Sequence, residues 1–186
     1  MTGDKAHQQG AEIPLVDEHE LARRASQADP LLLPVWKLLR EVKDPEIPVL
    51  SIEDLGILQE ISREGDQWVV TITPTYSGCP AMDQISQDIQ AVLEREGYTP
   101  FRIVSRLSPA WTTDWISRRG RDKLEAYGIA PPVGRSAGLS DISPEVACPR
   151  CHSLNTRVIS EFGSTACKAL YQCNSCQEPF DYFKCH

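Results

Sequence analysis

Several motifs that mark common enzyme classes are missing from this chain of 186 residues. No two glycines are separated by a single residue, which excludes the GxGxxG fingerprint of dinucleotide-binding folds. No glycine precedes a lysine and no GxSxG motif occurs, so the chain has neither a Walker A phosphate loop nor a hydrolase nucleophile elbow. No histidine lies between His19 and His152, so a Ser-His-Asp or Cys-His system would have to take its base from one end of the chain. We therefore do not expect hydrolysis by a catalytic triad.

Long apolar runs and an excess of positive charge are also absent. The apolar runs fall well short of the about 18 residues that a membrane-spanning helix needs. The chain has 19 basic and 26 acidic residues and a net charge of −7, whereas a nucleic-acid scaffold is usually basic. Residues 1–30 lack the continuous apolar core of a secretory signal. We therefore expect a cytoplasmic protein that binds neither nucleic acid nor a membrane.

The hydrophobic pattern before the cysteine-rich end is typical of a small α+β fold. From Pro34 onward, apolar residues recur at the i, i+3, i+4 and i+7 spacing of a helix, which Asp44-Pro45 ends. A second amphipathic helix begins at Pro80 and ends at Gly97. Three strands are predicted, at Ile57–Ile61, Trp68–Thr73 and Phe101–Leu107. The predicted fold class is α+β, with a small three-stranded sheet covered by helices and a C-terminal metal-ribbon module.

Composition shifts along the chain divide it into five segments. A stretch rich in proline, glycine and serine follows a helical pattern that Thr112 or Thr113 would cap and Gly128 would end. The predicted segments are a mobile tail (1–30), a small α+β domain (31–110), a connecting helix (111–130), a linker (131–145) and a cysteine-rich module (146–186). We expect the linker to be protease-sensitive and the two modules to be separable.

The strongest motif is a pair of CxxC knuckles near the C-terminal end. Cys148-Pro-Arg-Cys151 and Cys173-Asn-Ser-Cys176 can place four thiolates around one ion, because each tight turn supplies two sulfurs. In a reducing compartment such crowding indicates metal binding before disulfides. The module is too short to fold on its own core, so a metal is physically needed. Zinc is favoured, although a single iron or an iron–sulfur cluster uses the same ligands.

Two further cysteines of the module, Cys167 and Cys185, fall outside the knuckles. One interpretation is that they are small buried side chains in a small domain. The other is that they are ligands of a second thiolate site or of a cluster.

Cys79 lies apart from the other cysteines, between a predicted strand and a predicted helix. A thiol at a helix N-terminus meets unpaired backbone N–H groups, which favour the thiolate, and Gly78 allows close approach of a ligand. Such a thiolate can bind iron transiently or attack an electrophile. The alternative is a buried structural cysteine.

Acidic and basic side chains near these cysteines allow more than one interpretation. Asp44 and Glu46 are two residues apart, so in an extended segment both carboxylates can meet one cation. The alternative is a solvated turn that ends the preceding helix. The basic run 118–123 contains no phosphate-cradling glycine loop, and a solvated helix face explains it more simply than a phosphate site.

Several of these segments together resemble known families. The stretch DPEIPVLSIEDLGIL, the strand ending in TPTYSGCP and the later SPAW resemble the small iron–sulfur assembly domain of SufT-type proteins and of eukaryotic cytosolic cluster-targeting factors, over about residues 34–111. The segments PAWTTDW, YGIAPP, CPRC, EFGSTACKALYQC and EPFDYFKC resemble the PaaD family. PaaD proteins are accessory subunits of the multicomponent phenylacetyl-CoA oxygenase (epoxidase) system.

The resemblance implies a role in aerobic phenylacetate catabolism as a non-catalytic accessory protein. It implies that Cys79 is the functional thiol handling a transient iron or iron–sulfur species, with Thr75, Asp44 and Glu46 beside it. It also implies that the protein assembles or delivers such a centre to a partner among the oxygenase subunits, the iron–sulfur reductase above all. The chain has no Glu-x-x-His pair, so it cannot itself build a di-iron carboxylate site.

Two other functions remain open at this point. A stoichiometric structural or coupling subunit of the oxygenase is the main alternative, and a free-standing thiol enzyme ranks last because it lacks a nearby base.

Overall fold

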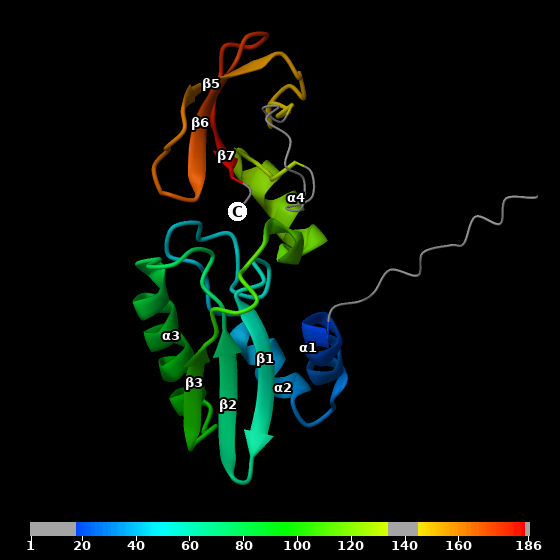
Figure 1. Cartoon of the computed structure of the whole chain (residues 1–186), viewed down its shortest axis with the longest axis vertical. Coiled ribbons are helices and arrows are strands. Elements are labelled where there is room, and N and C mark those ends of the chain that lie inside the picture. Colours follow the sequence, from blue (N-terminus) through cyan, green and yellow to red (C-terminus); the bar gives the residue numbers. More distant parts are fainter. Residues whose placement is uncertain (1–17, 134–144, 185–186) are drawn as a thin grey trace, which may run out of the picture.

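The computed structural model describes residues 18–133 and 145–184. Figure 1 shows an α+β part built on one small sheet, a second sheet formed by the C-terminal part, and α4 beside the second sheet. The elements are α1 (Glu18–Ala28), α2 (Leu33–Leu39), β1 (Leu58–Glu64), β2 (Gln67–Ile72), α3 (Ala81–Arg95), β3 (Phe101–Ser105), the 3-10 helix η1 (Thr113–Trp115), α4 (Arg118–Tyr127), β4 (Ile129–Ala130), β5 (Thr156–Ser160), β6 (Lys168–Cys173) and β7 (Pro179–Phe183). The predicted α+β class is confirmed.

The first sheet has the order β1-β2-β3. β1 and β2 are antiparallel and are joined by a tight turn in which Gly65 has a φ of +60°, a conformation that glycine adopts without strain. β2 and β3 are parallel because α3 connects them as a crossover. β2 is the central strand and is buried from Trp68 to its end, so both of its faces are covered, whereas the alternation of its residues predicts a half-buried strand.

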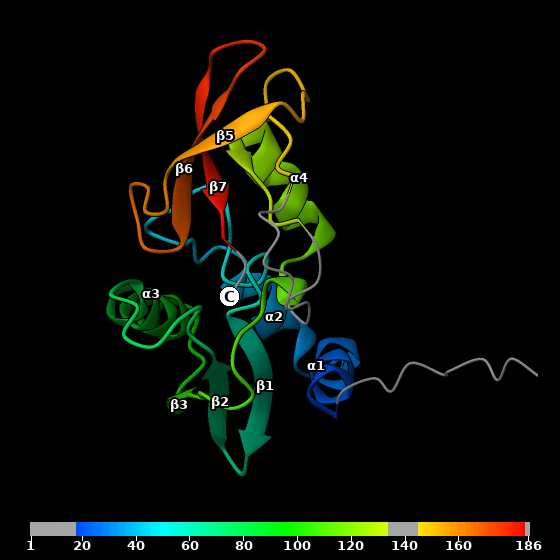
Figure 2. The same cartoon turned by 45° about the horizontal axis from the view of Figure 1, so that its top comes forward.

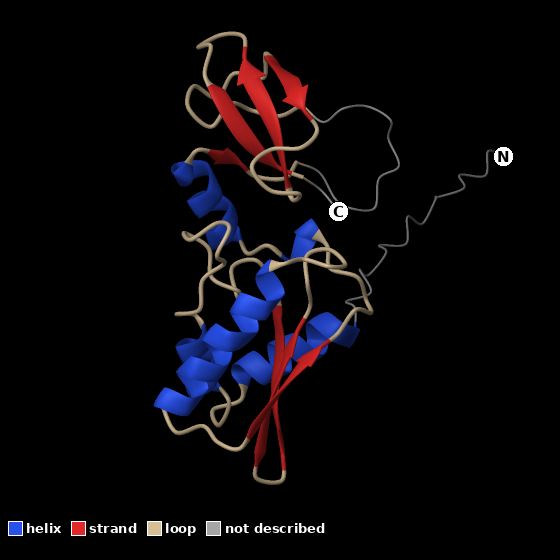
Figure 3. Ribbon diagram, turned by 90° about the vertical axis from the view of Figure 1, so that its left-hand side faces the viewer, coloured by secondary structure: helices blue, strands red, loops and turns tan. Residues whose placement is uncertain are grey.

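Helices α2 and α3 supply much of the first core. Val35 and Leu39 of α2 and Ile85 and Ile89 of α3 are all buried, which is the spacing that predicted both helices. Gly97 follows α3 with a φ of +77° and ends the helix as expected. Figure 3 shows these helices beside the first sheet.

The packed part of the chain begins within the segment that the sequence predicts to be a mobile tail. α1 lies within residues 1–30, and its Ser26 hydroxyl donates to the Ile61 carbonyl at 2.5 Å and accepts from the Ile61 N–H at 3.2 Å. The Trp36 indole donates to the same hydroxyl at 3.1 Å, so α1 is tied to both β1 and α2. Residues 1–17 of the predicted tail and 134–144 of the predicted linker lie outside the described residues.

The prediction of one continuous helix over 111–130 needs correction. The α-helix begins at Arg118, because the Ser117 side chain accepts from the Gly120 N–H at 2.9 Å and caps it. Thr113 belongs to η1, and Gly128 ends α4 in the left-handed region at a φ of +91°, as predicted. The two residues after Gly128 form β4, which pairs with the C-terminal sheet.

A buried ion network fixes α4 against the first domain. The Asp54 carboxylate, fully buried, accepts from Lys123 Nζ at 2.6 Å and from Arg119 Nε at 2.7 Å. Glu53 is paired with Arg40 at 2.5 Å on its other side. A Cβ on Gly120 would lie 2.8 Å from the Asp54 carbonyl, so only glycine permits this approach. The basic run of α4 is therefore structural in this region, which neither interpretation of the sequence had anticipated.

The second sheet has the order β4-β7-β6-β5 and shares a core with the first domain. β4 pairs in parallel with β7, and β6 pairs antiparallel with both β5 and β7. Phe183 of β7 and Cys167 before β6 are buried in the core cluster of the first domain, and Trp111 packs against Phe183 with ring centroids 6.2 Å apart. Figure 2 shows β7 running towards the first domain. Among the described helices, none has both the length and the apolar character needed to cross a membrane.

Candidate functional site

The four knuckle cysteines come together at one end of the second sheet. Cys148 Sγ is 3.7 Å from Cys176 Sγ, and Cys151 Sγ is 3.5 Å from Cys173 Sγ. All four sulfurs lie within 4.8 Å of one another. Tetrahedral zinc–thiolate bonds of about 2.3 Å place neighbouring sulfurs about 3.8 Å apart, so the spacing fits one such ion.

The two knuckles have the same local design. His152 and Gln177, each directly after the second cysteine of its knuckle, have positive φ values of 59° and 64°. The His152 N–H donates to the Cys148 carbonyl at 2.8 Å, and the Cys176 N–H lies 3.5 Å from Cys173 Sγ. Each turn therefore directs two sulfurs inwards, as the CxxC spacing predicts.

The thiols of this cluster lie close enough to shift one another's pKa values. The backbone N–H of Cys176 donates to Cys173 and lowers the pKa of Cys173 to about 6. The Ser153 backbone acts in the same direction on Cys151, but hydrogen bonds with the neighbouring thiols outweigh it and raise the pKa of Cys151 to about 12. Four thiolates this close need a cation, so the donor set is that of a metal site.

The second candidate site is the loop between β2 and α3. Cys79 is half-buried there, directly after Gly78, whose φ is +82°. The Cys79 N–H donates to the Tyr76 carbonyl at 3.2 Å, and α3 begins two residues later with Pro80 as its N-cap. Thr75 is buried just after the end of β2. The predicted position of Cys79 between a strand and a helix is confirmed.

Tyr76 is a residue of this loop that the sequence analysis missed. Its phenol is hydrogen-bonded to the Cys79 side chain. Burial first, and then the charges of Cys79 and Glu46, raise the pKa of Tyr76 to about 12. The phenol is therefore a permanent hydrogen-bond donor next to the thiol. Its place three residues before Cys79 in the sequence TYSGC was the available signal.

The two acids predicted to act together have different surroundings. Asp44 Oδ1 accepts from the backbone N–H groups of Glu46 at 2.9 Å and Ile47 at 2.7 Å, which fixes the turn after α2. Burial raises the pKa of Asp44. Glu46 is half-buried and instead points its carboxylate to the second sheet, where Glu46 Oε2 is 3.7 Å from Cys167 Sγ. Asp44 thus fixes the turn that holds Glu46 in position to contact Cys167.

Cys167 lies with the first domain and not with the knuckle cysteines. It is buried, and its sulfur is 3.1 Å from the Thr165 hydroxyl oxygen. Burial above all, with Glu46 adding to it, raises the pKa of Cys167 to about 11 despite the contact with Thr165. Cys185, the other cysteine without a predicted partner, lies outside the described residues.

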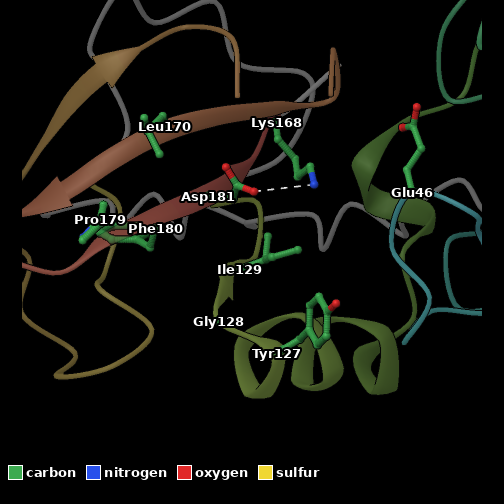
Figure 4. Close-up of a pocket in the computed structure, with 9 residues that line it drawn as sticks. All are labelled: Glu46, Tyr127, Gly128, Ile129, Lys168, Leu170, Pro179, Phe180 and Asp181. Atoms are coloured by element: carbon green, nitrogen blue, oxygen red, sulfur yellow. Dashed lines mark ion pairs between the residues drawn. The ribbon is translucent and has the colours of Figure 1, made fainter. Parts of the chain in front are cut away.

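An open pocket of about 470 Å³ lies against the second sheet and the end of α4, and Glu46 lines it too. Figure 4 shows Lys168 and Asp181 pointing towards each other on its wall, and their charged atoms are 3.5 Å apart. The Lys168 side chain is only 6% exposed. Ile129 of β4, the strand partner of Asp181, and Tyr127 at the end of α4 line the pocket as well.

Two family descriptions match separate parts of the chain. Residues 34–97 match the family described as "Iron-sulfur cluster assembly protein", and residues 133–184 match the family described as "PaaD zinc beta ribbon domain". The first range contains Cys79 and the second contains the four knuckle cysteines.

Curated relatives match most of the chain or only its first domain. A protein of Escherichia coli (strain K12), named as one subunit of a "Putative 1,2-phenylacetyl-CoA epoxidase", is 52% identical over 165 residues, which are 89% of this chain and 99% of that protein. A "Fe-S protein maturation auxiliary factor" of Porphyromonas gingivalis is 37% identical over 92 residues, which are 48% of this chain and 87% of that protein. Among solved structures, a domain of unknown function (DUF59) from Bacillus anthracis has a TM-score of 0.47 and 24% identity over 56% of this chain and 95% of that one.

Proposed function

The chain belongs to the PaaD family of phenylacetyl-CoA epoxidase subunits, and we propose that it assembles or delivers an iron or iron–sulfur centre to a partner subunit of a phenylacetyl-CoA oxygenase. The iron–sulfur reductase is the client that we favour, because its own centre has to be supplied. The protein itself is a non-catalytic accessory component, acting in the cytoplasm.

One observation carries the proposal: a half-buried thiol, Cys79, lies in the domain that matches the iron–sulfur assembly family. Thiolate sulfur is the ligand that binds iron–sulfur clusters and Fe²⁺. The Tyr76 phenol beside it donates a hydrogen bond, and hydrogen bonds to cluster sulfurs tune how such centres are held. A single half-buried thiol with a carboxylate nearby holds a centre less firmly than a closed set of four cysteines. A centre that is bound weakly can be released to the partner subunit.

The ribbon cysteines have a different role in this proposal. Cys148, Cys151, Cys173 and Cys176 hold one zinc ion, which supplies the cross-link that the small second sheet needs in order to fold. The closed set leaves no coordination position for a substrate, so the zinc is structural. In this proposal the ribbon positions the protein on its client, and the first domain carries the cargo.

One observation favours the alternative of a stoichiometric coupling subunit. Val158 and Ile159 on the edge strand β5, and Phe162 after it, are large apolar side chains that are 43–67% exposed. An apolar edge of this kind is typical of a protein contact. A delivery factor needs that contact only transiently, whereas a coupling subunit keeps it. Gel filtration of the assembled oxygenase separates the two functions, because only a coupling subunit stays with the complex.

The test of the proposal is the variant Cys79→Ser, which preserves the size of the side chain. We expect cells carrying it to lose growth on phenylacetate while the purified variant keeps its unfolding temperature and zinc content. Their reductase or oxygenase subunits should be short of iron, and iron and sulfide added in vitro should restore them. Ser77→Ala, two residues away and exposed, is the matched control. Normal growth and full iron in the partners of Cys79→Ser cells would contradict the proposal.

A further inference from the structure

β5 is the outer strand of the second sheet and lacks the residues that usually protect such a strand. The order β4-β7-β6-β5 leaves one edge of β5 without a neighbouring strand among the described residues. Proteins often guard a free edge with lysine or proline, because its unpaired backbone groups can bind another chain. β5 has the sequence TRVIS, which contains neither. Figure 1 shows β5 at the end of the molecule away from the first sheet, so its edge is open to a second strand.

Exposed apolar side chains are concentrated on this strand and beside it. Eight large apolar side chains are exposed among the described residues, and four of them lie in the segment 154–162, namely Leu154, Val158, Ile159 and Phe162. The pairing of β5 with β6 shifts its register after Val158. Such a bulge can protect an edge, but this one leaves two consecutive apolar side chains exposed. An apolar surface on an open edge is typical of a protein contact.

The charges on the two sides of Ile159 have opposite signs. Arg157 lies two residues before it and Glu161 two residues after it, and both are exposed. The Arg157 guanidinium donates to the neutral Gln172 side chain, and among the described residues neither charge has an oppositely charged partner. If two copies of β5 pair antiparallel about a twofold axis at Ile159, Arg157 of each copy stands opposite Glu161 of the other. The strand is therefore complementary in charge to a second copy of itself.

The net charge of the ribbon module does not oppose this contact. Residues 145–184 contain four basic and four acidic residues, whereas the whole chain has a net charge of −7. Two copies that meet through β5 therefore bring neutral modules together and keep the acidic parts apart. The contact also removes Val158 and Ile159 from water. Because a twofold axis uses the same surface on both copies, each ion pair forms twice.

We propose that β5 is the interface of a homodimer, in which it pairs antiparallel with β5 of a second copy about an axis at Ile159. This inference goes beyond the proposed function and does not rest on it. The loop that carries Cys79 leads into α3, which Figure 1 shows beside the first sheet and away from β5. The dimer therefore leaves one Cys79 loop accessible on each copy. The apolar edge is then occupied by the second copy and not by an oxygenase subunit.

Sedimentation equilibrium of the full-length, zinc-saturated protein over a range of concentrations tests the proposal. We expect a dimer that dissociates on dilution. Ile159→Lys places a charge at the twofold axis, as protected edge strands do, and should give a monomer at every concentration. Leu107→Lys, which changes an exposed apolar residue of the first domain, is the matched control and should stay dimeric. Melting temperature and zinc content check that each variant is folded.

A charge exchange tests the register and does not depend on Ile159. Arg157→Glu puts two carboxylates opposite each other on both sides of the axis and should weaken the dimer about tenfold or more. Adding Glu161→Arg to that variant reverses both charges, so the affinity should return to within about threefold of the original.

Two results would overturn the inference. A protein that is monomeric at all concentrations has no such interface, and its apolar edge is then free for an oxygenase subunit. A dimer that neither Ile159→Lys nor Arg157→Glu weakens, or that the charge exchange fails to restore, is held together by another surface.

Discussion

Of the charged residues in the junction between the first domain and α4, the buried Asp54 should be the one whose replacement lowers the stability of the fold most. Asp54→Asn keeps the size of the side chain but removes the negative charge that Lys123 contacts at 2.6 Å and Arg119 at 2.7 Å. The new amide also directs N–H groups at these cations. Breaking a buried ion pair costs about 3–5 kcal/mol. The two cations are 34% and 52% exposed and regain water, so we expect a smaller loss than this, about 2–3 kcal/mol of unfolding free energy.

The pH dependence of this loss gives a second check. Burial alone would raise the pKa of Asp54, but the hydrogen bonds from Lys123 and Arg119 outweigh it and hold the pKa far below its ordinary value. A carboxyl whose pKa is lower in the folded state stabilises the fold above its unfolded-state pKa of about 3.9 and loses that effect as the pH falls towards the folded-state value. The difference between the two proteins should thus be constant from about pH 5 to 7 and shrink below about pH 4.

Urea unfolding of the zinc-saturated protein, followed by tryptophan fluorescence, measures both effects. Asp66→Asn is the matched control, because the Asp66 side chain is fully exposed and its change should stay within about 0.5 kcal/mol. Equal stability of Asp54→Asn and the unsubstituted protein at pH 7 would refute the account of the α4 junction. So would a difference that does not shrink in acid.

Three further predictions follow from the same structure. Cys148→Ser should release the ribbon metal and increase hydrogen exchange across residues 145–184, whereas unchanged metal content and exchange would exclude a structural site. A chain ending at residue 130 loses Cys167 and Phe183 from the shared core and also loses the partner strand of β4. It should therefore melt at a lower temperature than the full chain. Equal melting temperatures would support the separable modules that the sequence predicts. Tyr76→Phe removes the hydrogen bond to Cys79 and should change the alkylation rate of that thiol with little effect on unfolding, and an unchanged rate would show that the bond is absent in solution.

Features that depend on neighbouring residues could be predicted from the sequence. The knuckles, the helix after Pro34 and the stop at Gly128 each depend on a few adjacent residues, and the structure contains all three, although the helix ends at Leu39 and not at the predicted Asp44-Pro45. The start of α4 could not be placed, because Thr112, Thr113 and Ser117 are all capable caps. The choice of Ser117 depends on packing against Asp54, whose carbonyl accepts from the Ser117 N–H at 2.9 Å.

Contacts between distant segments could not be predicted from the sequence pattern. The approach of Glu46 to Cys167 requires that β6 and β7 be folded and that Phe183 be packed in the first core, and no local spacing reports this. The same holds for Asp54 and Lys123, whose charges suggest a solvated surface until α4 is placed. The sequence therefore predicted Cys79 with Asp44 and Glu46 near it, and it did not indicate that Glu46 reaches Cys167 of the second module.

The central claim is that Cys79 carries iron in transit, and a transfer assay tests it most directly. Full-length protein loaded with radioactive iron is mixed, without oxygen, with metal-free reductase and a chelator that captures free iron. The account predicts that the unsubstituted protein loads the reductase despite the chelator and that Cys79→Ser does not. Equal loading by both proteins, or capture of all the iron by the chelator, would contradict it.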